Sequence, residues 1–168
     1  AGSVALGGGD EIFFEKFFSA PMRHNAELFE TVAELLAKSD SNPSDITDIY
    51  ISIGPGSFTG IRIAVTMAKM MALAKNINIV GVKTTDALAE NAKTCIIEQK
   101  LPINRIATII DAKRNHFFTA VFEKVGDQWE KTTDDTLITA KQFVEDFAGS
   151  EEPLWLLGEG LLYYKDKF

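Results

Sequence analysis

Apolar and polar residues recur along this chain with two different periods, and these periods predict alternating strands and helices. The first half is predicted to contain a β-hairpin around a Gly-Gly-Gly-Asp turn, then an amphipathic helix, a strand and a second helix. We place these elements at residues 4–18, 23–38, 49–53 and from the following glycine-rich turn to about residue 75. The Ser-Asn-Pro-Ser stretch at 41–44 ends the first helix.

A strand at 77–82 and a helix at 85–99, capped by Thr84 or Thr85, follow these elements and lead to a strand at 106–110. The second half of the chain then repeats the order hairpin, helix and strand. A hairpin, a helix and a strand follow at 116–131, 139–147 and 154–157. Because the second hairpin is preceded by a strand ending at Asp111, symmetry predicts a similar strand ahead of Ala1. The chain starts inside a strand-like pattern without Met, so we expect both of its ends to be cut.

Two tandem α/β units of this kind predict a duplicated ribonuclease H-like fold, as in actin-like ATPases (the ASKHA fold), truncated at both ends. We place an N-terminal lobe at 1–104, without its first strand, and an incomplete C-terminal lobe at 105–168. Actin-like and sugar-kinase ATPases hold ATP between two such lobes. By analogy, ATP at the lobe junction is an open possibility.

A glycine-rich loop joins the strand at 49–53 to the next helix, and it is the most specific motif in the chain. It consists of Gly54, Pro55, Gly56, Ser57, Phe58, Thr59 and Gly60, with Arg62 behind it. Glycine adopts positive φ without steric cost, and Ser57 and Thr59 can cap the helix. A helix N-terminus after such a turn favours a phosphate contact. The loop has neither the Gly-Lys-Ser/Thr ending of a P-loop nor GxGxxG, so a simple tight connection is the alternative.

Charge and composition narrow the classes of function. The hydrophobic share of 46% and charged share of 24% are typical of a globular protein. A net charge of −7 with scattered lysines and arginines argues against autonomous nucleic-acid binding, so another chain would hold any RNA. The single cysteine excludes an internal disulfide. No apolar run approaches membrane length, which predicts a cytoplasmic protein without membrane contact.

Few residues are candidates for chemistry. The two histidines, His24 and His116, are far apart in sequence, and neither an HxxxH pair nor another metal-ligand spacing occurs. Asp111, at the end of a buried-looking strand, is the best single carboxylate. It either orients a metal-bound phosphate or water, as in an actin-like ATPase, or is simply a turn former. A counterpart from the first half would lie ahead of Ala1, so no paired-carboxylate site can be assembled. We predict no catalytic residue and no metal site.

The helix after the glycine-rich loop has one face with little side-chain bulk. Small residues recur every fourth position, beside a band of methionines, at Gly60, Ala64, Ala68, Ala72, Met67, Met70 and Met71. Small residues permit close helix packing, and methionine adapts to an irregular facing surface. Either a partner subunit covers part of this helix, or both of its faces are core.

Several stretches together resemble the TsaB (YeaZ) family of tRNA threonylcarbamoyladenosine biosynthesis proteins. The string Gly-Pro-Gly-Ser-Phe-Thr-Gly-Ile-Arg at 54–62 is nearly the family signature, and Ile-Asp-Ala-Lys-Arg at 110–114 resembles a second segment. Gly158-Glu159-Gly160 matches a Gly-x-Gly of the second lobe. His24 lies where members show His-Ser, with Asn25 in place of the serine, and Ala64 and Met70 replace common glycines. The family's Asp-Thr-Ser turn would precede the first residue.

The resemblance implies a non-catalytic paralogue of TsaD, the transferase that modifies the adenosine next to the tRNA anticodon. Such a subunit has no cofactor, pairs with a TsaD-type subunit, is contacted by a TsaE-type ATPase, meets tRNA only indirectly and forms a homodimer when alone. The first two long helices would form the interface, which we assign to His24, Phe29, Val32, Leu36, Ala64, Met67, Ala68 and Met71. The alternative is an actin-like ATP-dependent phosphotransferase that uses the 54–60 loop and Asp111.

Overall fold

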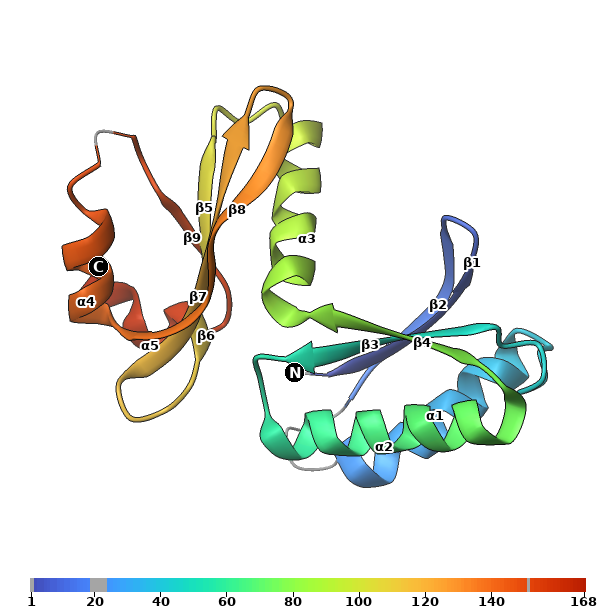
Figure 1. The fold of residues 1–168 in the computed structure, drawn as a ribbon. Coiled ribbons are helices and arrows are strands. Elements are labelled where there is room, and N and C mark those ends of the chain that lie inside the picture. The colour runs from blue at the N-terminus through green and yellow to red at the C-terminus, as the bar shows by residue number, and fades with distance from the viewer. Residues whose placement is uncertain (1, 19–23, 151) are drawn as a thin grey trace. The chain divides into compact units, whose positions relative to one another are not determined.

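The structure is a computed structural model that describes residues 2–18, 24–150 and 152–168, without the side chains of residues 24–26. The chain forms two compact units (Figure 1). The first consists of Ala1–Ile51 and Ser57–Gly81, and the second of Ser52–Gly56 and Val82–Phe168.

The first unit contains the predicted hairpin, helix, strand and helix. The hairpin pairs β1 (Ser3–Gly8) with β2 (Glu11–Phe17) in antiparallel register. Helix α1 (His24–Lys38) packs on this hairpin and against α2 (Phe58–Lys75). Strand β3 (Asp48–Gly54) pairs with β4 (Asn78–Lys83). The two strand pairs are separate two-stranded sheets. The strand predicted ahead of Ala1 lies outside the described residues.

The second unit is built on one mixed sheet. Strand β5 (Arg105–Thr108) pairs antiparallel with β7 (His116–Val125) and parallel with β9 (Trp155–Leu157). The short β6 (Ile110–Asp111) and the long β8 (Gln128–Thr139) also pair with β7. The helices of this unit are α3 (Thr84–Glu98), α4 (Ala140–Phe147), α5 (Leu161–Tyr164) and the 3-10 turn Lys165–Lys167.

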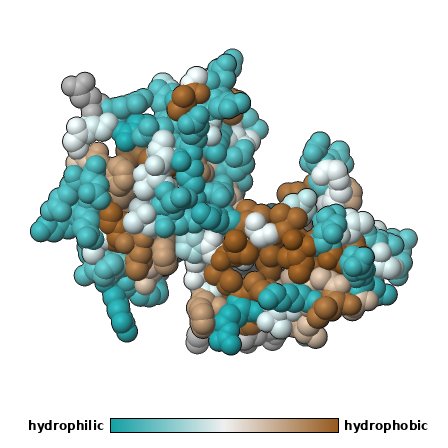
Figure 2. Space-filling model, in the orientation of Figure 1, coloured by the Kyte–Doolittle hydropathy of each residue, from teal (hydrophilic) through white to brown (hydrophobic). Residues whose placement is uncertain are grey.

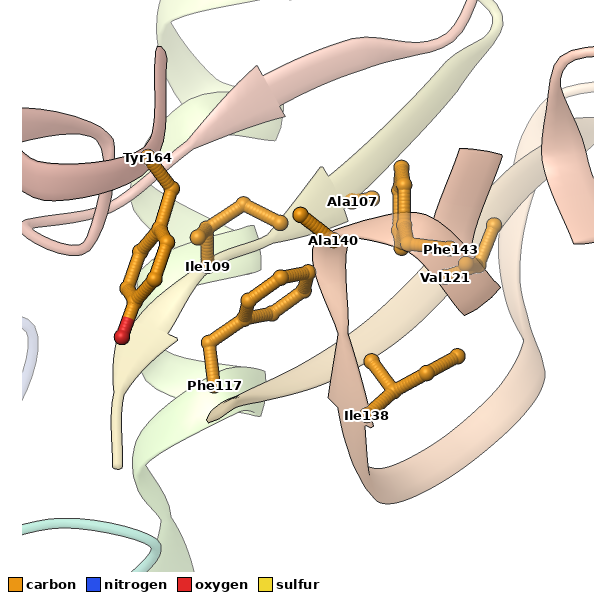
Figure 3. Packing of buried hydrophobic residues seen from close by; sticks show 8 residues of the cluster. All are labelled: Ala107, Ile109, Phe117, Val121, Ile138, Ala140, Phe143 and Tyr164. Atoms are coloured by element: carbon orange, nitrogen blue, oxygen red, sulfur yellow. The ribbon is translucent and has the colours of Figure 1, made fainter. Parts of the chain in front are cut away.

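Neighbouring residues of a strand point to opposite faces of a sheet, so the strands of this sheet place apolar side chains on both faces. Helices of the unit cover both faces and bury these side chains. On one face Phe117 is fully buried, with its ring centroid 5.7 Å from that of Phe143 and 5.4 Å from that of Tyr164 (Figure 3). On the other face Ala89 and Ile96 of α3 belong to a second buried cluster. Strand β5 contributes to both clusters.

Helix α3 differs from its prediction in two ways. The sequence placed it in the lobe that ends at residue 104, whereas it packs against β5 and β7 of the second unit. Its apolar stripe therefore completes the core of the second sheet. The N-cap residue is Lys83 without a side-chain hydrogen bond, so the predicted threonine cap is wrong. The hydroxyl of Thr85 donates to Asp135 of β8 instead.

The Thr85–Asp135 contact belongs to a half-buried ionic network that attaches α3 to β8. Lys131 Nζ donates to Asp86 Oδ1 at 2.8 Å and to Asp135 Oδ1 at 2.9 Å. Burial alone raises the pKa of Asp135, but hydrogen bonds from Thr85 and Lys131, with the charges of Lys131 and Lys83, lower it below its ordinary value. The charged form of Asp135 is therefore the form that the folded unit favours.

This network predicts an acid-sensitive contribution to stability. Because the folded pKa of Asp135 is lowered, its contribution is present above the unfolded pKa of about 3.9 and is lost as the pH falls through the folded value. We expect Asp135→Asn to be less stable than the parent at neutral pH and to lose less stability on acidification. Urea unfolding from neutral pH to about pH 3 measures this. The matched control is Asp134→Asn, since the Asp134 side chain is 85% exposed; equal acid dependence of parent and Asp135→Asn would contradict the assignment.

Candidate functional site

The glycine-rich loop connects β3 to α2 as predicted, but only one of its three glycines has positive φ. Gly54 has a φ of 103°, a region that favours glycine, and a cis peptide bond joins it to Pro55. Ser57 is the N-cap of α2, and its Oγ accepts the Gly60 N–H at 3.3 Å. Thr59 lies within the first turn of the helix and is not the cap. The Ser57 cap is confirmed, and it holds the loop end against the helix.

The loop presents an exposed aromatic residue and a cation. Phe58 is 73% exposed, and the Arg62 guanidinium carbon lies 5.1 Å from the centre of its ring. A Cβ built on Gly60 would lie 3.5 Å from the Ser57 Cβ and Oγ, which is an ordinary contact. The chain's own packing therefore does not require glycine at position 60. The phosphate contact of residues 54–62 stays a prediction.

A groove of about 300 Å³ lies in the first unit, beside this loop. Its walls come from α1 and α2, and they are apolar at Phe29, Ile63 and Met67 and polar at the remaining positions, Thr59, Arg62 and Thr66. Phe29 is 54% exposed although it is a large aromatic residue. Aromatic residues and arginine are enriched in protein–protein contacts, so this groove is a candidate surface for one.

Of the eight residues assigned to the interface, three are interior. Ala68 is 1% exposed, and Leu36 and Met67 are also buried. They pack inside the unit because α1 and α2 contact each other and the hairpin. Their placement on a free surface is therefore wrong, although Met67 also lines the groove. Phe29 is exposed and Val32, Ala64 and Met71 are half-buried, so these four remain candidates. His24 begins α1, but its side chain lies outside the described residues.

The Asp111 carboxylate is bound by residues of the turn that follows it. Its carboxylate accepts hydrogen bonds from the Lys113 backbone N–H at 2.9 Å and from the Tyr164 hydroxyl at 2.9 Å, and it pairs with the Lys113 ammonium. The side chain is 6% exposed. Burial raises the pKa of Asp111, and the bonds from Lys113 and Tyr164 lower it below its ordinary value. Asp111 thus has the geometry of a turn former, which was one of the two interpretations of its sequence context.

The turn after Asp111 has an uncommon backbone. Lys113, Arg114 and Asn115 have φ values of 66°, 53° and 62°, and each left-handed non-glycine residue costs about 1–3 kcal/mol. The Asp111 carboxylate and a bond from the His116 N–H to the Lys113 carbonyl, 3.0 Å long, hold this turn. The sequence pattern did not predict this conformation. Tyr164, which joins the turn to the core, has no local sequence signal.

The comparisons with known proteins agree with the motifs. The family model described as TsaD: tRNA N6-adenosine threonylcarbamoyltransferase matches residues 19–153, which include the loop, the α1–α2 groove and the Asp111 turn. The chain belongs to this family. Among its relatives, the Bacillus subtilis (strain 168) protein TsaB, a tRNA threonylcarbamoyladenosine biosynthesis protein, is 27% identical over 162 residues, which are 96% of this chain and 68% of the relative. The Escherichia coli (strain K12) TsaB is 29% identical over 108 residues, 64% of this chain and 45% of the relative.

Within the TsaD family, the chain falls in the TsaB (YeaZ) group, in agreement with the resemblance found in its motifs. The solved structure of YeaZ from Pseudomonas aeruginosa matches with a TM-score of 0.80 and 22% identity, over 99% of this chain and 74% of that one. This likeness establishes the fold, which is the predicted duplicated ribonuclease H-like fold of the actin-like ATPases.

Two features of this TsaB-group chain concern ligands and membranes. Among the residues that the structure describes, no three His, Cys, Asp or Glu side chains gather where they could hold a metal ion. In the same part of the chain, no helix is both long and apolar enough to cross a membrane.

Proposed function

We propose that this chain acts in tRNA threonylcarbamoyladenosine biosynthesis as a non-catalytic subunit that pairs with a TsaD-type transferase. The observation that carries the proposal is the α1–α2 groove with Phe29 exposed beside it, in a chain whose relatives are named for this pathway. The net charge of −7 supports a subunit that leaves tRNA contact to its partner.

The α1–α2 surface is proposed to be shared by two alternative pairings. Alone, the chain forms a homodimer in which the same surface meets itself, an isologous contact. In the presence of the TsaD-type subunit, that subunit takes the place of the second copy. A TsaE-type ATPase then binds the heterodimer. The proposed location of this assembly is the cytoplasm, where the tRNA is modified.

Light scattering after size-exclusion chromatography tests the pairing. We expect the chain alone to have the mass of a homodimer, and an equimolar mixture with the same organism's TsaD-type subunit to have the mass of a one-to-one heterodimer. Two separate species with unchanged masses would contradict the proposed pairing.

We also propose that this subunit has no resident cofactor and does no chemistry. The engagement of the Asp111 carboxylate by Lys113 and Tyr164 supports this, because the proposed phosphotransferase would need that carboxylate for a metal-bound phosphate. Magnesium-dependent ATP turnover by the purified chain, reduced in Asp111→Asn, would contradict the proposal and favour the phosphotransferase.

A further inference from the structure

The two helices of the α1–α2 surface carry opposite charges. Helix α2 contains three cations, Arg62, Lys69 and Lys75, and no acidic residue in its 18 residues, although the chain has 24 acidic residues. Helix α1 contains three glutamates and one lysine. Because both helices belong to the first unit and contact each other, one surface combines a basic helix with an acidic helix.

The cations of α2 lie on its exposed side. Phe58, Arg62, Thr66, Lys69 and Leu73 follow one another at intervals of three or four residues, which places them along one side of the helix. Each of them is exposed, Phe58 by 73% and Leu73 by 89%. Figure 2 shows apolar and hydrophilic side chains side by side over the part of the first unit where α2 runs. The exposed side of α2 therefore combines positive charge with large apolar residues.

An exposed carboxylate lies on the neighbouring helix. Glu30 follows Phe29, the aromatic residue exposed at the groove. Within the part of the chain that the structure describes, no ion pair includes Glu30, Arg62 or Lys69. By contrast, Glu34, one turn further along α1, is paired within the unit. The surface thus offers a carboxylate and two cations that the described part of the chain does not pair.

These charges distinguish between the ways in which two copies can meet. If α2 lay against α2 across the symmetry axis, Arg62 and Lys69 would face cations, and α1 against α1 would bring Glu30 toward glutamates. Like charges opposite each other disfavour a contact, whereas opposite charges fix its register. The crossed arrangement, α1 against α2, brings opposite charges together twice, because an isologous contact repeats each pair.

We propose that the homodimer forms with α1 of each copy against α2 of the other, and that Glu30 of one copy pairs with Arg62 of the other. This arrangement rests on the proposed function, because it describes the contact of the homodimer proposed there. Phe29 follows Glu30 in α1, and Phe58 lies against the Arg62 guanidinium, so aromatic rings flank both partners. Rings that reduce contact with water strengthen the attraction between the charges.

Charge reversal tests the arrangement. Glu30→Arg and Arg62→Glu each bring like charges together twice in a dimer, and each is expected to raise the homodimer dissociation constant by roughly tenfold to a hundredfold. The double variant Glu30→Arg/Arg62→Glu exchanges the two charges, so we expect its dissociation constant to return to within about threefold of the parent value. Sedimentation equilibrium over a range of concentrations measures these constants, and circular dichroism checks that the variants are folded.

Arg114→Glu is the matched control, since Arg114 is an exposed arginine of the second unit. It is expected to dimerise like the parent. Unchanged dissociation constants in both single variants, or a double variant no tighter than the single ones, would overturn the arrangement while the homodimer itself stands. A parent chain that is monomeric at every concentration would overturn the arrangement together with the proposed homodimer, so the two failures are distinguishable.

Discussion

Replacing Phe29 by glutamate is expected to abolish pairing with the TsaD-type subunit at micromolar concentration while leaving the chain folded. Phe29 is 54% exposed on α1 and lines the groove beside Ile63 and Met67, so the new charge would be desolvated in the interface. Loss of a central aromatic contact costs about 2–4 kcal/mol, or roughly 30- to 1,000-fold in affinity. Titration calorimetry with the partner, supported by light scattering, measures the effect.

A matched control separates the groove from general surface effects. Val125 at the end of β7 has the same exposed fraction, 54%, but lies in the other unit. Val125→Glu is therefore expected to pair like the parent. If Phe29→Glu is folded and still pairs with unchanged affinity, the partner binds another surface and the assignment of the groove is wrong.

Gly158→Ala is expected to destabilise the second unit by about 3 kcal/mol or more. Gly158 has a φ of 122°, and a Cβ at this position would lie 2.4 Å from the Ile109 carbonyl oxygen. That oxygen also accepts the Gly160 N–H at 2.9 Å, so moving the Ile109 carbonyl aside would break this hydrogen bond. Unfolding followed by Trp129 and Trp155 fluorescence, both in the second unit, measures the loss.

Gly149→Ala is the control for this substitution, because a Cβ there would meet nothing within 4 Å. We expect its stability to stay within about 0.5 kcal/mol of the parent. Equal stability of Gly158→Ala and Gly149→Ala would mean that the backbone at 158 relaxes, contrary to the close approach to Ile109.

The hairpin of the second unit shows where the sequence pattern was insufficient. Strand β8 was predicted to end at residue 131, but it continues to Thr139. The continuation reads Thr-Thr-Asp-Asp-Thr over 132–136, which has the composition of a loop. Pairing with β7 keeps this polar stretch extended, for instance where Thr119 faces Thr136. Propensity over a few residues does not include that cross-strand contribution.

The α1–α2 surface shows the same limit for side chains. Ala64 and Ala68 are one helical turn apart and chemically identical, yet Ala68 is 1% exposed and Ala64 is half-buried. Periodicity indicated that this helix is apolar on more than one side. It could not distinguish the side that the chain buries from the side left for a partner, because that depends on where α1 packs.

Local chemistry was sufficient for the order of elements, the Ser57 cap and the motifs that resemble the family. Each of these depends on residues a few positions apart, and the steric and hydrogen-bonding interactions between such residues do not depend on the rest of the fold. The burial of Ala68, the Tyr164 contact to Asp111 and the joining of α3 to the second sheet depend on residues far apart in the sequence. Only the folded chain brings such residues together, because packing selects among surfaces that the sequence makes equally apolar.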